Sequence, residues 1–258
     1  MSWIFKQLFY QRYSFLERKI FKDLTVNTDK ALAVLDLGSG DGQFAFYANK
    51  KAKNCRIFCE DIAPQNLEFI SLYAQHNQVE NLRCLNSEND KLSLKFDRIW
   101  IFSMLHYVEN EIDFLKIARD RLNIHGKILL YSPINHIKRG WLYMILFHSL
   151  NHYESMNQRK KVYNFNQLIE LFDIVGLEMQ KHEFICSKYG IRSQEWLSNT
   201  MMFLGSKNFG MKFFGLCYFM IASLPILIWK WIDRFSNKNE RNSNAVYFEL
   251  INKSNSIN

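Results

Sequence analysis

Short apolar runs alternate with longer amphipathic segments through most of the chain, and this pattern predicts its secondary structure. The runs have the length and the Val, Ile, Leu and Phe content of buried strands. We expect strands at residues 33–37, 56–60, 81–85, 98–102 and 127–131, with later candidates at 177–185 and 245–251. Helical patterns lie between them, for example at residues 64–78 and 111–122. Strands that alternate with helices predict an α/β fold, a mostly parallel sheet with helices on both faces.

Two segments depart from this alternation. Residues 3–24 place apolar side chains at helical spacing with Lys, Arg and Glu between them, which predicts an amphipathic helical cap. Residues 213–229 contain no charged side chain and mark the sharpest change of composition in the chain. We therefore expect a cap at residues 1–30, a sheet domain at 31–190, an apolar helical insertion at 191–243, and a last strand with a polar tail at 244–258.

Composition narrows the function only slightly. The chain has 258 residues, enough for one large domain with its own core, and a net charge of +8. This excess of Lys and Arg over Asp and Glu suits an anionic partner, either nucleic acid or the anionic surface of a membrane. The five cysteines form no C-x-x-C pair and no zinc-binding spacing, so we expect reduced thiols and no metal site. The N-terminus lacks a signal-peptide pattern, which favours a cytoplasmic protein.

A glycine-rich loop follows the first predicted strand, in the stretch VLDLGSGDGQF at residues 34–44. Gly38, Gly40 and Gly42 allow a tight turn and let a ligand approach the backbone closely. In a doubly wound sheet such a loop lies at the carboxyl ends of the strands, where ligands bind. Its G-x-G-x-G spacing is one residue shorter than the dinucleotide fingerprint, and the absence of G-K-[ST] excludes a P-loop.

Carboxylates surround these glycines, which argues against a phosphate ligand. Asp36 and Asp41 flank the loop, Glu60 and Asp61 end the second strand, and Glu88 follows the third. A phosphate prefers helix N-terminal amides without carboxylates nearby. An acid-lined site instead suits a ligand that has positive charge and a ribose but no phosphate, and S-adenosylmethionine has these properties.

Five stretches, in their order along the chain, resemble motifs of the class I S-adenosylmethionine-dependent methyltransferases. VLDLGSGDGQF resembles motif I, and RIFCEDIAP resembles the end of the family's second strand. NLRCLNSEND and FDRIWIFSMLHYV resemble the third and fourth strands, and RLNIHGKILLYSP resembles a helix end, a glycine turn and the fifth strand. The resemblance covers residues 30–135 clearly. It implies a Rossmann-like seven-stranded sheet, mostly parallel with the last strand antiparallel.

The resemblance also implies which residues bind the cofactor. Asp61 would bind the ribose hydroxyls, and strand alternation places Glu60 on the opposite face, so only one of the two faces the ligand. Glu88 would meet the adenine amino group, although the family more often has aspartate there, and Asn89 would offer its backbone amide. The implied cofactor set is Asp36, Gly38, Ser39, Gly40, Gly42, Asp61, Ile62, Glu88, Asn89 and Ser103.

The acceptor is expected above the end of the fourth strand, near Ser103, His106 and Tyr107. His106 is a candidate base, needed only if the acceptor must lose a proton, or a residue that positions the acceptor. A helix-start or packing role is the alternative. Tyr107 is a candidate aromatic wall of the pocket. The [ND]-P-P-[YFW] element of nucleic-acid amino-methyltransferases is absent after the fourth strand, so nucleic acid is a disfavoured partner.

The apolar insertion suggests contact with a membrane. Residues 213–229 are at the short limit for a bilayer span and contain Pro225, which would kink a helix. If residues 244–253 return to the sheet, a single crossing is excluded. An interfacial helix flanked by Lys and Arg, or a helix packed on the protein, remains. Residues 140–150 form a second apolar stretch, which would join this surface or cover the acceptor.

These observations lead to one main hypothesis and two alternatives. The chain is expected to transfer a methyl group from S-adenosylmethionine to a small-molecule or lipid-like acceptor, as a cytoplasmic protein peripheral to the inner face of an anionic membrane. The first alternative is a soluble O- or N-methyltransferase with an enclosed acceptor pocket. The second is a non-catalytic methyltransferase-like membrane adaptor. The oligomeric state and the acceptor atom stay open.

Overall fold

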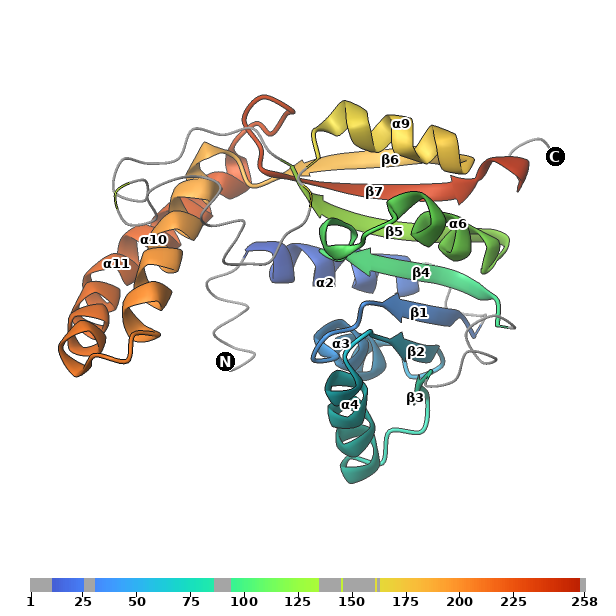
Figure 1. The fold of residues 1–258 in the computed structure, drawn as a ribbon, viewed down its shortest axis with the longest axis horizontal. Helices are drawn as coiled ribbons and strands as arrows, with labels where there is room; N and C mark the ends of the chain where they lie inside the picture. The colour runs from blue at the N-terminus through green and yellow to red at the C-terminus, as the bar shows by residue number, and fades with distance from the viewer. Residues whose placement is uncertain are drawn as a thin grey trace. The chain divides into compact units, whose positions relative to one another are not determined.

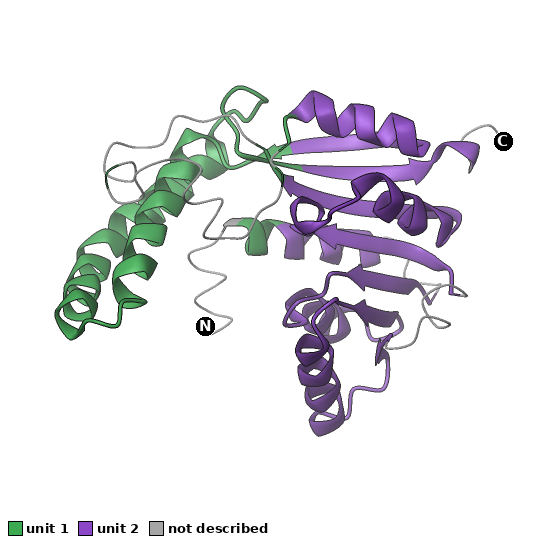
Figure 2. Cartoon of the chain, in the orientation of Figure 1, with its two compact units in different colours: residues 1–15, 133–164, 184–246 green, residues 16–132, 165–183, 247–258 purple. Residues whose placement is uncertain are grey.

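The computed structural model describes residues 11–25, 31–85, 94–134, 145, 161 and 163–255. The chain divides into two compact units (Figure 2). The sheet unit comprises residues 16–132, 165–183 and 247–258. The hairpin unit comprises residues 1–15, 133–164 and 184–246.

Seven strands form one sheet in the order β3-β2-β1-β4-β5-β7-β6 (Figure 1). The last strand, β7, runs antiparallel to the other six. This confirms the predicted Rossmann-like seven-stranded sheet. The strands are β1 Ala33–Leu37, β2 Arg56–Glu60, β3 Leu82–Cys84, β4 Phe96–Phe102, β5 Leu122–Pro133, β6 Leu177–Ile185 and β7 Ala245–Asn252.

Helices cover both faces of this sheet, as β7 shows. Tyr247 and Phe248 are consecutive residues of β7, so their side chains point to opposite faces. The Lys19 ammonium of α2 lies 5.1 Å from the Tyr247 ring centre, and the Phe172 ring of α9 lies 5.0 Å from that of Phe248. The helices that lie wholly or mostly in the sheet unit are α2 Gln11–Thr25, α3 Gln43–Lys51, α4 Pro64–His76, α6 Glu111–Asp120 and α9 Phe165–Val175, with 3₁₀ turns η1 Leu105–Tyr107 and η2 Lys253–Asn255.

The central strand β1 is buried along its whole length, as expected for a strand between two parallel neighbours. The N-terminal helix α2 packs by an apolar stripe of Leu16, Ile20 and Leu24, all buried, at the spacing of one helical face. An ion pair of 2.7 Å between Asp23 of α2 and Arg98 of β4 adds a polar contact to this packing.

The start of β5 differs from the prediction. The resemblance predicted a glycine turn before a strand at residues 127–131, but β5 begins at Leu122 and contains Gly126. Between the pairs Phe96–Leu122 and Arg98–Lys127, β4 advances by two residues and β5 by five. A Cβ on Gly126 would lie 2.9 Å from the Phe96 carbonyl oxygen. The glycine therefore allows a close backbone contact within a bulged start of the strand.

The hairpin unit contains two long helices, α10 Lys188–Leu204 and α11 Phe209–Phe235. The apolar segment predicted at residues 213–229 is the centre of α11. Pro225 lies inside this helix, which continues on both sides of it. The apolar helical insertion before the last strand is thereby confirmed.

Candidate cofactor and acceptor site

The three glycines after β1 adopt backbone conformations that other residues rarely accept. The φ angles of Gly38, Gly40 and Gly42 are 81°, 54° and 73°. A Cβ on Gly38 would lie 2.8 Å from Met104 Cγ, and one on Gly42 would lie 2.7 Å from Ile70 Cγ1. A Cβ on Gly40 would have no described atom within 4 Å. Gly38 and Gly42 therefore permit close packing, whereas Gly40 leaves the surface of the loop open.

The carboxylate of Asp61 is held against this loop. Its Oδ2 accepts a hydrogen bond of 2.8 Å from the Gly40 N–H. Its Oδ1 accepts bonds from the Ala63 N–H and the Asn66 side chain at 2.9 Å and 3.0 Å. A carboxylate has about four lone-pair sites, so acceptor capacity remains for a ligand. The structure thus fixes Asp61 at the carboxyl end of β2 beside Gly40.

Glu60 has a different environment from its neighbour. Its carboxylate accepts a hydrogen bond of 2.8 Å from Arg121 Nη1, and both side chains of this ion pair are largely buried. The Glu60 carbonyl oxygen accepts from the N–H groups of Gly38 and Ser39 at 2.7 Å and 3.1 Å. Glu60 therefore supports the sheet and the loop, and Asp61 is the acid beside Gly40, the division that strand alternation predicts.

Asp36 is the most perturbed acid of the site. It is 2% exposed, and its Oδ2 is buried without a hydrogen-bond partner among the described residues. Burial, followed by the nearby carboxylates of Asp61 and Asp41, raises the pKa of Asp36 from 3.8 to about 7. A buried carboxylate that lacks a partner and faces other carboxylates favours a cationic ligand and opposes a phosphate. The residues present therefore fit S-adenosylmethionine.

Two further polar groups near the glycine loop were not predicted. Gln43 is the first residue of α3, and both of its amide atoms are buried without a partner in the described structure. Trp100 of β4 is in register with Asp36, and its Nε1 is likewise buried and unpartnered among those residues. The place of Gln43 directly after the third glycine was the available sequence signal. No sequence signal points to Trp100, because its position beside Asp36 depends on the register between β1 and β4.

The predicted acceptor residues lie together where β4 ends. Ser103 has a positive φ of 58°, and its N–H donates to the Tyr131 carbonyl oxygen at 2.9 Å. His106 is 2% exposed and Tyr107 is 39% exposed, with their ring centres 4.2 Å apart. Met104, between them and Ser103, contacts Gly38. The β4 end and the glycine loop are thus in direct contact.

The remaining predicted residues have simple placements. Ser39 is buried at 7% exposure and Ile62 is 89% exposed, directly after Asp61. Glu88 and Asn89 lie outside the described residues, as does the stretch 140–150 apart from Ile145. In the described part of the chain, no three His, Cys, Asp or Glu side chains form a group that could hold a metal.

The strand order, the glycine loop and the acid after β2 define the fold and site of the class I S-adenosylmethionine-dependent methyltransferases. Residues 35–128, from β1 into β5, match the family model described as a methyltransferase domain. The chain therefore contains a methyltransferase domain with this fold, and S-adenosylmethionine is the cofactor of such a domain. Among curated proteins, no match to the sequence was found.

Solved structures share the fold at low sequence identity. A protein assigned as a sarcosine dimethylglycine methyltransferase from Galdieria sulphuraria is 14% identical, with 92% of this chain and 85% of that chain covered and a TM-score of 0.59. Phosphoethanolamine N-methyltransferase 2 from Haemonchus contortus is 14% identical, with 92% and 52% covered and a TM-score of 0.60. Geranyl diphosphate C-methyltransferase from Streptomyces coelicolor A3(2) is 10% identical, with 93% and 81% covered and a TM-score of 0.57. Identities this low support a shared fold and leave the acceptor open.

Proposed function

We propose that this chain transfers a methyl group from S-adenosylmethionine to a small acceptor with an apolar, lipid-like body, at the cytoplasmic face of a membrane. The observation that carries the donor half is the buried, unpartnered carboxylate of Asp36 beside an open glycine loop. The observation that supports an apolar acceptor is the exposure of helix α11. In the 18-residue stretch of α11 with the highest mean hydropathy, only 17% is buried.

The donor would be held by groups from two adjacent strands, β1 and β2, and the loop after β1. Asp61, already oriented by three hydrogen bonds, would accept from the ribose hydroxyls. Asp36 would face the cationic part of the donor, and the bare backbone at Gly40 would allow close approach. When bound, the donor supplies an already activated methyl group on a positively charged sulfur. The protein then has to orient the acceptor and exclude water.

The acceptor side would be formed by the turn η1 at the end of β4. His106 is buried and would remove a proton only from an acceptor that must lose one before methylation. Tyr107 is partly exposed and would line the pocket as an aromatic wall.

The lipid-like acceptor is proposed from the chemistry of the molecule and from its fold relatives. One relative was solved with phosphomonomethylethanolamine and another with geranyl diphosphate, a small amine-bearing phosphate and an apolar phosphate. An exposed apolar helix would place this enzyme where apolar acceptors concentrate. The acceptor classes that fit are a quinone or polyprenoid precursor, a lipid, or a lipid-linked saccharide.

The test uses methyl-labelled S-adenosylmethionine with a total lipid extract and, separately, a water-soluble metabolite extract. We expect label in the lipid extract with the wild type and with the exposed-site control Asp173→Ala, and little label with Asp61→Ala. Label only in water-soluble products, together with a protein that stays soluble without detergent and does not sediment with vesicles, would instead support the enclosed-pocket enzyme. Donor binding without any transfer would support the adaptor.

A further inference from the structure

The two helices of the hairpin unit pack closely along their length. A Cβ on Gly215 of α11 would lie 2.8 Å from Phe203 Cβ of α10, so the backbones approach where the glycine lies. Leu197, Ala222 and Ile226 form a buried apolar cluster between the helices. One face of α11 is therefore buried against α10.

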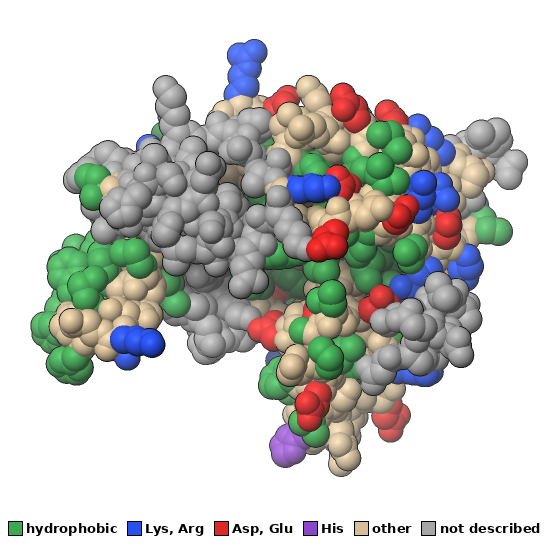
Figure 3. All heavy atoms as spheres, in the orientation of Figure 1, with side chains coloured by type: hydrophobic (Ala, Val, Ile, Leu, Met, Phe, Trp, Pro, Cys, Tyr) green, Lys and Arg blue, Asp and Glu red, His purple; other side chains and the backbone are tan. Residues whose placement is uncertain are grey.

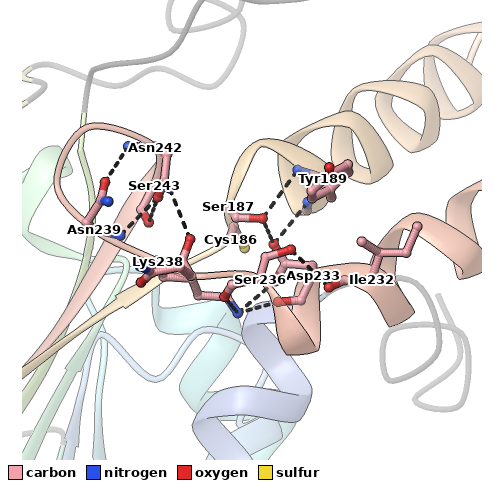
Figure 4. A network of polar contacts seen from close by, with 12 residues as sticks. Cys186, Ser187, Tyr189, Ile232, Asp233, Ser236, Lys238, Asn239, Asn242 and Ser243 are labelled. Atoms are coloured by element: carbon pink, nitrogen blue, oxygen red, sulfur yellow. Dashed lines mark hydrogen bonds and ion pairs between the residues drawn. The ribbon is translucent and has the colours of Figure 1, made fainter.

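A buried polar network locks the end of α11 to the start of α10 (Figure 4). Asp233 is 3% exposed, and its Oδ1 accepts from Ser187 Oγ at 2.6 Å and from the Gly190 N–H at 3.1 Å. Lys238 Nζ lies 3.5 Å from Asp233 Oδ2. The carboxylate therefore satisfies the Gly190 amide in the first turn of α10 and interacts favourably with the dipole of that helix. Together with the packing above, this network makes α10 and α11 one rigid element.

The opposite face of α11 is apolar and exposed, and Figure 3 shows hydrophobic side chains gathered over this hairpin. Phe213, Met220, Leu224 and Trp231 form an outward stripe at helical spacing, each between 61% and 71% exposed. The other large exposed apolar side chains of α11 are Phe209, Met211, Phe214, Leu216, Ile221, Leu227, Ile228 and Phe235. An apolar surface this extensive marks an interaction site.

The charged side chains that α10 and α11 expose are basic. Residues 188–238 are all described, and their only acids, Glu195 and Asp233, are each 3% exposed. The basic residues of the same segment are exposed or half-buried: Lys188, Arg192, Lys207, Lys212, Lys230, Arg234 and Lys238. On the α11 wheel, Lys212, Lys230 and Arg234 lie on one flank of the apolar face. This combination suits anionic headgroups beside acyl chains.

We infer that α11 lies in the plane of one leaflet of an anionic membrane, with its outward stripe in the acyl region and its basic flank at the lipid phosphates. This rests on the proposed membrane location and specifies how the membrane is recognised. If α11 spanned the bilayer, α10 would enter it as well, because the two helices are packed together. The charged and polar side chains of Arg192, Glu195 and Asn199 would then lie in the bilayer, which is costly. A second copy of the chain as the partner would bring basic flanks together, which is unfavourable.

The first experiment measures sedimentation of the full chain with vesicles of phosphatidylglycerol and phosphatidylcholine. We expect Ile221→Glu and Leu224→Glu each to weaken binding roughly ten- to a hundredfold, because each removes a buried aliphatic side chain from the acyl region. The matched control Ile174→Glu, at a 63% exposed position on α9, is expected to bind as the wild type does. Neutral vesicles should bind much more weakly than anionic ones.

The second experiment measures depth. Single cysteines at Phe213, Leu224 and Trp231, in a Cys84→Ser, Cys217→Ser background, carry a fluorophore that shallow and deep lipid quenchers reach differently. An in-plane helix predicts equal, shallow depth at all three positions. A spanning helix predicts that the central position is much deeper than the two ends, since a helix of 27 residues is about 40 Å long.

Three results would overturn the inference. They are no binding to anionic vesicles, a depth gradient along α11, or a lipid-independent dimer that Ile221→Glu dissociates. Donor binding measured by calorimetry on the same preparations separates these failures from failure of the methyltransferase assignment, because the glycine loop lies in the sheet unit and the substitutions lie in the hairpin unit.

Discussion

Replacing Asp36 with asparagine should make the protein more stable at neutral and alkaline pH while weakening its affinity for the donor. The pKa of Asp36 is raised from 3.8 to about 7 by burial and by the carboxylates of Asp61 and Asp41. The folded state therefore binds this proton more tightly than the unfolded state does. Stability is lost as pH rises through the window between these two pKa values, and the full destabilisation is present above about pH 7.

The size of the effect follows from this shift. At about 1.4 kcal/mol per tenfold change, a pKa raised from 3.8 to about 7 corresponds to about 4 kcal/mol of destabilisation at pH 8 and to less than half of that at pH 5. Structural relaxation reduces such values, so we expect Asp36→Asn to gain about 2–4 kcal/mol at pH 8. The gain at pH 5 should be smaller by about 2 kcal/mol.

Urea unfolding followed by circular dichroism at pH 5 and pH 8 measures both free energies of unfolding. Asp173→Asn, at an exposed position of α9, is the matched control and should change little at either pH. The reasoning about Asp36 would be refuted if the Asp36→Asn protein were less stable than the wild type at pH 8. A stability gain that is equal at the two pH values would refute it as well.

Three further predictions concern the donor site and the hairpin. Because a cationic ligand binds ionised Asp36, the affinity for S-adenosylmethionine should fall about tenfold from pH 8 to pH 6, and calorimetry of Asp36→Asn should show no such slope. Gly38→Ala should destabilise the fold by about 1–3 kcal/mol, because φ is positive and the new Cβ would lie 2.8 Å from Met104; unchanged urea unfolding would contradict this. Ser187→Ala should lower stability by about 1–3 kcal/mol, because buried Asp233 loses a hydrogen-bond donor. Hydrogen exchange should then rise in the first turn of α10, and unaltered protection there would rule out the proposed role of the network.

Strands could be predicted well where local sequence decides them. The bounds of β1, β2 and β6 are the same as those predicted, and glycines mark two of these ends, Gly38 after β1 and Gly176 before β6. The start of β5 could not be predicted, since its bulge depends on contact between Gly126 and the backbone of β4. Helix α11 extends past the C-terminal end of the charge-free run, where buried Asp233 accepts hydrogen bonds from Ser187 and Gly190, a contact that no local pattern shows.

In the candidate site, too, local sequence predicts some features and tertiary packing decides the others. The glycine loop and the different environments of Glu60 and Asp61 follow from motif spacing and strand alternation. The contact of Met104 with Gly38 and the buried amide of Gln43 could not be derived, because each depends on how η1 or α3 packs against the loop. Residues 195–210 form a more polar segment before the charge-free run. Most of it lies in α10, where its polar residues Glu195 and Asn199 are buried.

The most direct test of the central claim is calorimetric titration of the purified full chain with S-adenosylmethionine at pH 8. The account predicts one site per chain, an affinity weakened roughly ten- to a hundredfold in Asp61→Ala through loss of charged hydrogen bonds, and wild-type affinity in Asp173→Ala. Circular dichroism should show that both variants are folded. A wild type that does not bind the donor, or an Asp61→Ala variant that binds it as tightly as the wild type, would contradict the account.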